Sequence, residues 1–260
     1  MTEPPGGSAH LDEVTALALL NYGHYTAMRV DERRVRGLSW HLDRLMRDCR
    51  RVFDAELDPD WVRHLIRRAL TETPRSIVVR VSVFDPALEL SHPGADARPQ
   101  LLVTTRAAAP VPLPALRLQS SAYRRELPEV KHVGLFGSLH RRRIAQRNGF
   151  DDVVFTDADG TLSEAATSNI GFLDGDRIVW PQADCLAGVT MRLISESHGG
   201  QVSTAALTLS QVADMDAAFV TNAVVGIRSV SAIDGIQWPA GHPVLHTLRQ
   251  QYATIPAEPL

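Results

Sequence analysis

The chain has 260 residues, 44% of them hydrophobic, and a formal net charge of −3 at pH 7. This length can form one large domain or two modest ones, each with its own core. The slight acidity leaves no global basic field for nucleic acid, and no apolar stretch reaches membrane-spanning length. Two cysteines without metal-ligand spacing, Cys49 and Cys185, favour a reducing, cytoplasmic setting and predict no metal site.

The first half of the chain predicts an α+β domain over residues 1–106. Residues 1–10 are polar, lack a signal-peptide pattern and are expected to be disordered. In residues 57–73, Asp58 is a predicted N-cap and is followed by proline and by apolar residues at helical spacing. Residues 75–85 and 99–106 are rich in β-branched side chains and predict paired strands.

Residues 107–115 contain three prolines and no periodicity, which predicts a linker between two domains. The larger second domain then covers residues 116–260. It is predicted to contain a helix within residues 134–150, ended by Asn148 and Gly149, and an antiparallel meander over residues 151–182. A helix, a strand segment and a final helix are expected after this meander.

Lys131 is the single lysine among 27 lysine and arginine residues. Arginine can replace lysine wherever any cation will serve, but a guanidinium is a poor nucleophile. An amine desolvated by its surroundings can lose its proton and attack a carbonyl. Lys131 is therefore either a Schiff-base residue or the chance survivor of an arginine-rich composition.

The order of several short motifs favours the first alternative. The motifs are "NYGHYTAMRV", "HLDRL", the lysine, "LSEAATSN", "LAGVT" and "VTNAV", spread over roughly residues 21–235. Together they resemble the fold-type IV pyridoxal phosphate enzymes, which include class IV aminotransferases and aminodeoxychorismate lyase. The resemblance implies an α+β / α/β, two-domain architecture like that of D-amino-acid aminotransferase, with pyridoxal phosphate at the domain interface. It also implies a homodimer that acts on small amino and keto acids, without nucleic-acid or membrane partners.

The resemblance assigns the cofactor contacts residue by residue. Lys131 matches the amine that holds the cofactor as a Schiff base and then moves the substrate's Cα proton. Glu164 matches the partner of the pyridine nitrogen, whose carboxylate preserves the ring as an electron sink. Asn169 is expected to brace the adjacent turn, and Arg44 matches the phosphate-binding arginine. Further cofactor contacts are expected from the helix start at Gly188, Val189 and Thr190 and from Thr221 and Asn222.

The substrate pocket is expected to be lined by Tyr25 and Thr26. Arg29 is a candidate for the substrate carboxylate, and Phe136 stands where branched-chain aminotransferases carry a tyrosine. The alternative for residues 21–30 is an ordinary strand with a core tyrosine.

The predicted reaction is transfer of an amino group between a small amino compound and a keto acid. Elimination by a pyridoxal phosphate lyase is the alternative, because "KHV", Thr26 and "TNA" resemble aminodeoxychorismate lyase. Ala27 and Gly134 depart from the lyase pattern, and residues 11–20 do not resemble the family's opening strand. A cofactor-free binding protein on the same fold is a further alternative. Donor, acceptor, stereochemistry and pathway stay open.

Overall fold

The computed structural model describes residues 11–70 and 76–260. The predicted disorder of residues 1–10 lies outside this range. The described chain forms two compact units, and it passes from unit 1 to unit 2 after Ala108, within the proline-rich stretch. A single boundary at this stretch does not separate the two units, because Val130–Gly134 and Ala257–Leu260 also belong to unit 1. Both segments were predicted to lie in the C-terminal domain.

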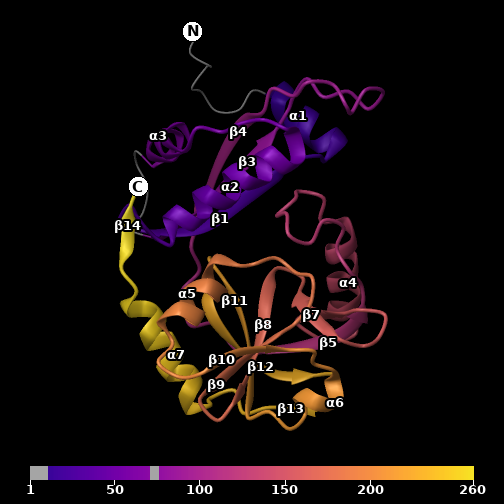
Figure 1. Ribbon diagram of the computed structural model, residues 1–260, viewed down its shortest axis with the longest axis vertical. Coiled ribbons are helices and arrows are strands. Elements are labelled where there is room, and N and C mark those ends of the chain that lie inside the picture. The colour runs from indigo at the N-terminus through magenta and orange to yellow at the C-terminus, as the bar shows by residue number, and fades with distance from the viewer. Residues whose placement is uncertain (1–10, 71–75) are drawn as a thin grey trace. The chain divides into compact units, whose positions relative to one another are not determined.

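Unit 1 is a five-stranded sheet with helices, and its sheet order is β14-β2-β1-β3-β4. The strands are β1 (His24–Asp31), β2 (Arg34–Arg36), β3 (Ser76–Phe84), β4 (Gln100–Ala107) and β14 (Ala257–Pro259). The helices are α1 (Leu11–Leu20), α2 (Leu38–Phe53) and α3 (Pro59–Ala69). Figure 1 shows α2 lying along β1. Residues 11–20, which do not match the family's opening strand, form α1.

Two helices of unit 1 follow from their sequences. The Asp58 carboxylate accepts a hydrogen bond from the Asp60 amide at 2.9 Å, and Pro59 occupies the first helical position, as predicted. Val62 and Ile66 of α3 are buried in the core of unit 1. Helix α2 also buries apolar residues against the sheet, but three polar side chains share its buried face: His41, Arg44 and Asp48. Burying polar groups is costly unless they have partners, so this face of α2 is a candidate site.

Unit 2 is built on a nine-stranded sheet in the described part of the chain. Its order is β10-β9-β8-β11-β12-β5-β6-β7, with β13 paired to β12. An additional β7–β8 pairing closes six of these strands into a ring. The strands are β5 (Leu116–Ala122), β6 (Asp152–Thr156), β7 (Leu162–Ala165), β8 (Ser168–Asp174), β9 (Arg177–Pro181), β10 (Val202–Ala205), β11 (Ala217–Asn222), β12 (Gly226–Ile233) and β13 (Ile236–Gln237).

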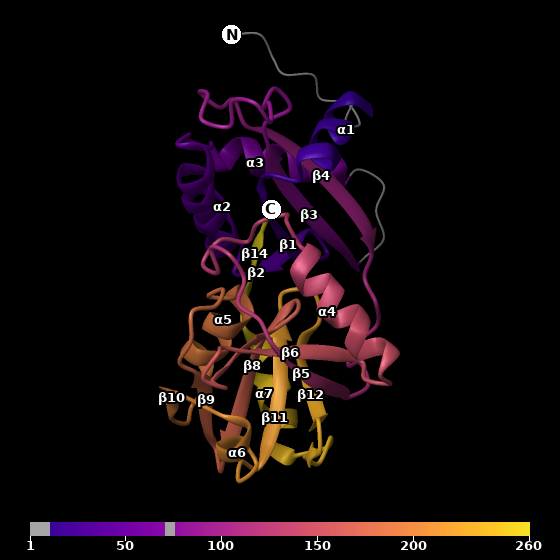
Figure 2. The same cartoon turned by 90° about the vertical axis from the view of Figure 1, so that its right-hand side faces the viewer.

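The helices of unit 2 are α4 (Phe136–Arg147), α5 (Val189–Ser197), α6 (Leu209–Val212) and α7 (Pro243–Thr254). Figure 2 shows α4 beside β5 and β6. Helix α4 ends as predicted at Asn148, and Gly149 follows with a φ of 86° that favours glycine. The predicted antiparallel meander is also present, as β6 to β9. Its apolar residues join β5, β11 and β12 in the core of unit 2.

Candidate functional site

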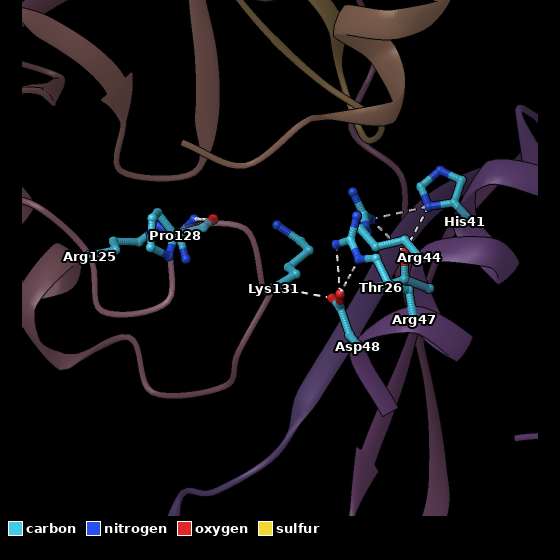
Figure 3. Close-up of polar contacts among 8 residues, drawn as sticks. All are labelled: Thr26, His41, Arg44, Arg47, Asp48, Arg125, Pro128 and Lys131. Carbon is cyan, nitrogen blue, oxygen red and sulfur yellow. Dashed lines mark hydrogen bonds and ion pairs between the residues drawn. The ribbon is translucent and has the colours of Figure 1, made fainter. Parts of the chain in front are cut away.

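The Lys131 backbone is held from two sides within unit 1. The Lys131 amide donates to Asp48 Oδ2 of α2 at 3.1 Å, and the Lys131 carbonyl accepts from the Tyr25 amide of β1 at 2.8 Å. The Val133 amide donates to the Gly23 carbonyl at 2.9 Å and continues the contact with β1. The lysine thus stands on a short segment that pairs with the start of β1, and Figure 3 shows its contact with Asp48. Its Nζ lies 4.9 Å from the centre of the Tyr25 ring.

Arg44 lies on the buried face of α2 in a network with Thr26 and His41 (Figure 3). Arg44 Nη2 donates to Thr26 Oγ1 at 2.8 Å, and Thr26 Oγ1 lies 2.7 Å from His41 Nδ1. Because this hydroxyl accepts from the guanidinium, it can give its own hydrogen to Nδ1, which assigns the imidazole proton to Nε2. Arg44 Nε has no partner among the described residues. The guanidinium is therefore oriented and still has a donor for a ligand.

Burial sets the charges of this network. Desolvation lowers the pKa of Arg44 to about 10 against the opposing charge of Asp48, so Arg44 stays cationic at neutral pH. Desolvation, then the positive charges of Arg44 and Lys131, lowers the pKa of His41 well below its usual value. Burial and Arg44 likewise lower the pKa of His24 to about 3. Both histidines are neutral, so Arg44 provides the positive charge of this buried network.

The substrate residues predicted on β1 divide between its two faces. Tyr25 lies on the face that carries Arg80 of β3, whose Cζ is 3.8 Å from the centre of the tyrosine ring. Thr26 points away from Tyr25, because successive side chains of a strand point to opposite faces, and its place in a substrate pocket stays a prediction. Thr26 is instead fully buried against α2.

Arg29 and Arg80 differ in their partners. Arg29 forms an ion pair with Asp31, 3.0 Å from Nε to Oδ1. Arg80 donates to the Ser82 hydroxyl at 3.1 Å and forms no ion pair with any carboxylate of residues 11–70 and 76–260. Arg80, rather than Arg29, therefore offers an uncompensated guanidinium next to Tyr25.

Glu164 of β7 lies in unit 2, is buried, and forms an ion pair. Arg125 Nε donates to Glu164 Oε1 at 2.6 Å, and the side chains of both residues are 9% exposed. Arg125 also donates to the Pro128 carbonyl, and Glu164 Oε2 accepts from the Leu186 amide at 3.4 Å. The ion pair fixes a buried carboxylate on the strand.

Asn169 of β8 braces the loop that leads into α5, rather than the turn next to it in sequence. Its side-chain amide donates to the Leu186 carbonyl at 2.6 Å. A Cβ at Gly188 would collide with Asn169 Oδ1, so any side chain there would displace the Asn169 amide. Gly188 is the N-cap of α5, and no side chain caps the amides of the first turn. The positive N-terminal end of this helix is therefore available to an anion.

The remaining predicted contacts of unit 2 differ in their availability. Thr190 and Thr221 are buried, and their hydroxyls have no partner within the described part of the chain. Val189 lies in the first turn of α5 beside Thr190. The Asn222 side chain is committed to the turn after β11, since it accepts from the Val224 and Val225 amides and donates to Ser168. Phe136 begins α4, stacks on His140 and is 80% exposed.

Sequence reasoning missed three residues of these networks: Asp48, Arg80 and Arg125. Nothing in their local sequence distinguishes them from solvated surface charges. Their partners are 83, 55 and 39 residues away, so that only tertiary contacts reveal them. Among the described residues, no helix is long and apolar enough to cross a membrane, and no group of side chains has metal-binding composition.

A family model described as "Amino-transferase class IV" matches residues 23–233. The chain belongs to this family. The match covers most of the chain, from the start of β1 to the end of β12, and includes all the residues of the candidate site. Membership confirms the predicted resemblance and supports pyridoxal phosphate as the cofactor.

Known relatives include proteins named for both reactions. A "Probable branched-chain-amino-acid aminotransferase" of Rickettsia bellii is 26% identical over 53% of this chain, and the aligned part spans about half (52%) of that relative. A crystal structure titled "Putative 4-amino-4-deoxychorismate lyase" from Legionella pneumophila has a TM-score of 0.80 and 24% identity, over 98% of this chain and 97% of that one. The PLP-bound form of a hypothetical aminotransferase from Mycobacterium tuberculosis has a TM-score of 0.79 and 19% identity, covering 98% and 95% of the two chains. These likenesses establish the predicted fold-type IV architecture.

Proposed function

We propose that this protein is a pyridoxal phosphate-dependent aminotransferase that moves an amino group between a small amino compound and a keto acid. The observation that carries the proposal is the placement of Lys131. Its backbone is fixed by Asp48 and Tyr25, its amine lies 4.9 Å from the centre of the Tyr25 ring, and both Lys131 and Arg44 act electrostatically on His41. An accidental surface lysine would have no reason to be held in this way.

The residues present fit the chemical parts of the cofactor. Lys131 supplies the amine for its aldehyde, and the unused donor of buried Arg44 suits its phosphate. In unit 2, the hydroxyls of Thr190 and Thr221, which have no partner among the described residues, and the open start of α5 suit an anion such as a phosphate. Glu164, held by Arg125, supplies a carboxylate for the ring nitrogen. Asn169 would support cofactor binding indirectly, by bracing the loop before α5. Asn222 would contact the cofactor through its backbone, since its side chain is bound within the protein.

The chain's own groups divide the remaining work. When bound, pyridoxal phosphate supplies an electron-withdrawing ring that stabilises negative charge on the neighbouring carbon. Lys131 Nζ would take the proton from the substrate carbon that bears the amino group, hold it as an ammonium, and give it up again when another carbon of the bound reactants is protonated. Tyr25 covers the amine, and Arg80 provides the positive charge for a substrate carboxylate.

Elimination remains the second candidate, and one observation favours it. The Legionella structure whose title names a lyase covers nearly the whole of this chain. The two reactions differ in their requirement for a second substrate. Transfer consumes a keto acid, whereas elimination expels a leaving group from the amino compound alone.

The first test is the replacement of Lys131 by arginine, which keeps the charge but not the nucleophile. We expect Lys131→Arg to fold normally, to lose covalent attachment of pyridoxal phosphate after borohydride reduction, and to lose at least about 10²-fold in turnover. Peptide mass mapping of the reduced wild-type protein should place the label on Lys131.

Arg143→Lys is the matched control, because it adds a lysine at an exposed position of α4. Its label should stay on Lys131. A Lys131→Arg variant with full activity would reject the mechanism. Repeated turnover of an amino substrate without a keto acid would show that the reaction is elimination rather than transfer.

We also propose a homodimer and a cytoplasmic location. Three large apolar side chains of α4 are exposed in the single chain, Phe136, Leu139 and Ile144, which supports burial by a second copy. Cys49 and Cys185 are both free, which supports a reducing compartment.

A further inference from the structure

Asp48 is a buried carboxylate that the proposed chemistry does not use. It is 1% exposed and lies one helical turn after Arg44 on the same face of α2. Moving a carboxylate out of water costs free energy, so a buried carboxylate such as Asp48 needs specific hydrogen-bond partners. Its two oxygens have different partners, and one of them leads directly to the proposed catalytic residue.

Asp48 Oδ1 accepts from Arg47 of the same helix, at 3.0 Å from Nε and 2.6 Å from Nη2. Asp48 Oδ2 accepts from the backbone amide of Lys131 at 3.1 Å, across 83 residues of sequence (Figure 3). The local ion pair with Arg47 orients the carboxylate. The second oxygen then fixes the peptide group from which the lysine side chain extends.

The segment that carries Lys131 depends on such contacts. Around Lys131, a stretch of five residues, Val130–Gly134, belongs to unit 1. The chain on either side of this stretch belongs to unit 2. The Lys131 carbonyl and the Val133 amide pair with β1, but the Lys131 amide faces α2 and is bound by Asp48. Asp48 therefore supplies a contact between this segment and the helix that carries Arg44.

We propose that Asp48 is the positioning residue of Lys131, holding its backbone at a fixed place relative to Arg44 so that the amine and the phosphate-binding cation act on one molecule. This inference rests on the proposed function. The negative charge of Asp48 also opposes the effect of burial on Arg44, whose pKa it raises. The carboxylate thus links Arg44 to Lys131 without touching the reacting atoms.

The test compares Asp48→Asn with Asp43→Asn, which removes an exposed carboxylate from the same helix. In Asp48→Asn the acceptor becomes a neutral amide oxygen, and its NH₂ group faces the donors of Arg47, so the bond to Lys131 weakens. We expect covalent attachment of pyridoxal phosphate to slow by about tenfold. Binding of pyridoxine 5′-phosphate, which has no aldehyde, should change by less than about twofold, because Arg44 is intact. Asp43→Asn should behave as wild type in both assays.

Hydrogen exchange of the cofactor-free protein provides a second readout that does not depend on the proposed function. Amides of residues 130–134 should exchange about tenfold faster in Asp48→Asn than in wild type or Asp43→Asn. Asp48→Glu, which keeps the charge but displaces the oxygens by one methylene, serves if Asp48→Asn does not fold. It should also slow attachment.

The outcomes separate the two proposals. Faster exchange without any label on wild-type Lys131 would keep the positioning role and reject the proposed function. Unchanged exchange with a wild-type attachment rate would overturn the positioning role. Equal losses in attachment and in pyridoxine 5′-phosphate affinity would also overturn it, because Asp48 would then act through Arg44.

Discussion

At the scale of single residues, unit 1 buries the cation Arg44 close to two neutral histidines, His24 and His41. His24 is completely buried, neither of its ring nitrogens has a partner among the described residues, and its ring lies 6.0 Å from that of Phe53. Protonation of His24 in the folded protein would place a second cation near Arg44. The folded state therefore excludes a proton that the unfolded chain accepts.

This exclusion predicts how stability depends on pH. The pKa of His24 is 6.5 when unfolded and about 3 when folded, so between these values the unfolded chain binds an extra proton. The free energy of unfolding should therefore fall as pH falls below 6.5, and His24 should account for about 2 kcal/mol between about pH 7 and about pH 5. Urea unfolding at both pH values of wild type and His24→Leu measures the effect. Equal losses in the two proteins would show that His24 does not cause it.

At the scale of elements, the start of α5 is shaped by contact with β8. Asn169 reaches the loop before the helix, and its close approach excludes a side chain at Gly188. Gly188 has a φ of −68°, which any residue can adopt, so the restriction is steric rather than conformational. The same contact keeps the N-terminus of α5 free of a capping side chain.

Gly188→Ala should therefore destabilise the protein by displacing Asn169. The Asn169 amide would have to turn away from the Leu186 carbonyl, which costs about 1–3 kcal/mol for a buried group left without its partner. Gly241→Ala is the matched control, since nothing lies within 4 Å of its new Cβ. Denaturant titration should show no further loss when Gly188→Ala is added to Asn169→Ala. Additive losses in the double variant would contradict the steric explanation.

At the scale of the whole molecule, the proposed homodimer makes α4 an interface. Leu139 and Ile144 are 49% and 44% exposed on a helix that also carries several arginines. A charge placed among the apolar side chains of such a face loses its water when two copies associate, which costs free energy. The exposed part of α4 should then tolerate charge in the monomer but not in the dimer.

We expect Leu139→Asp to weaken self-association by at least about tenfold, with secondary structure unchanged. Sedimentation velocity over a range of protein concentrations measures the effect. Leu90→Asp is the control, because Leu90 is 85% exposed and lies outside α4. A wild-type protein that is monomeric at all concentrations would reject the homodimer itself.

The sequence by itself determined the family, the cofactor and most of the helices and strands. These depend on local signals, such as the Asp58 cap, the Asn148–Gly149 helix end, and motifs around Lys131 whose order is visible in one chain. It also identified Arg44, Glu164 and Asn169 as residues of interest, since each lies within such a motif.

The tertiary structure decided which groups these residues meet. Strand alternation turned Thr26 away from Tyr25 and towards His41, and strand pairing placed Arg80 over Tyr25. The ion pair of Arg125 with Glu164 and the bond of Asp48 to Lys131 join residues far apart in the sequence. Local patterns cannot specify such pairs, because hydrogen bonds and ion pairs depend on distance in space, which is fixed only when the chain has folded.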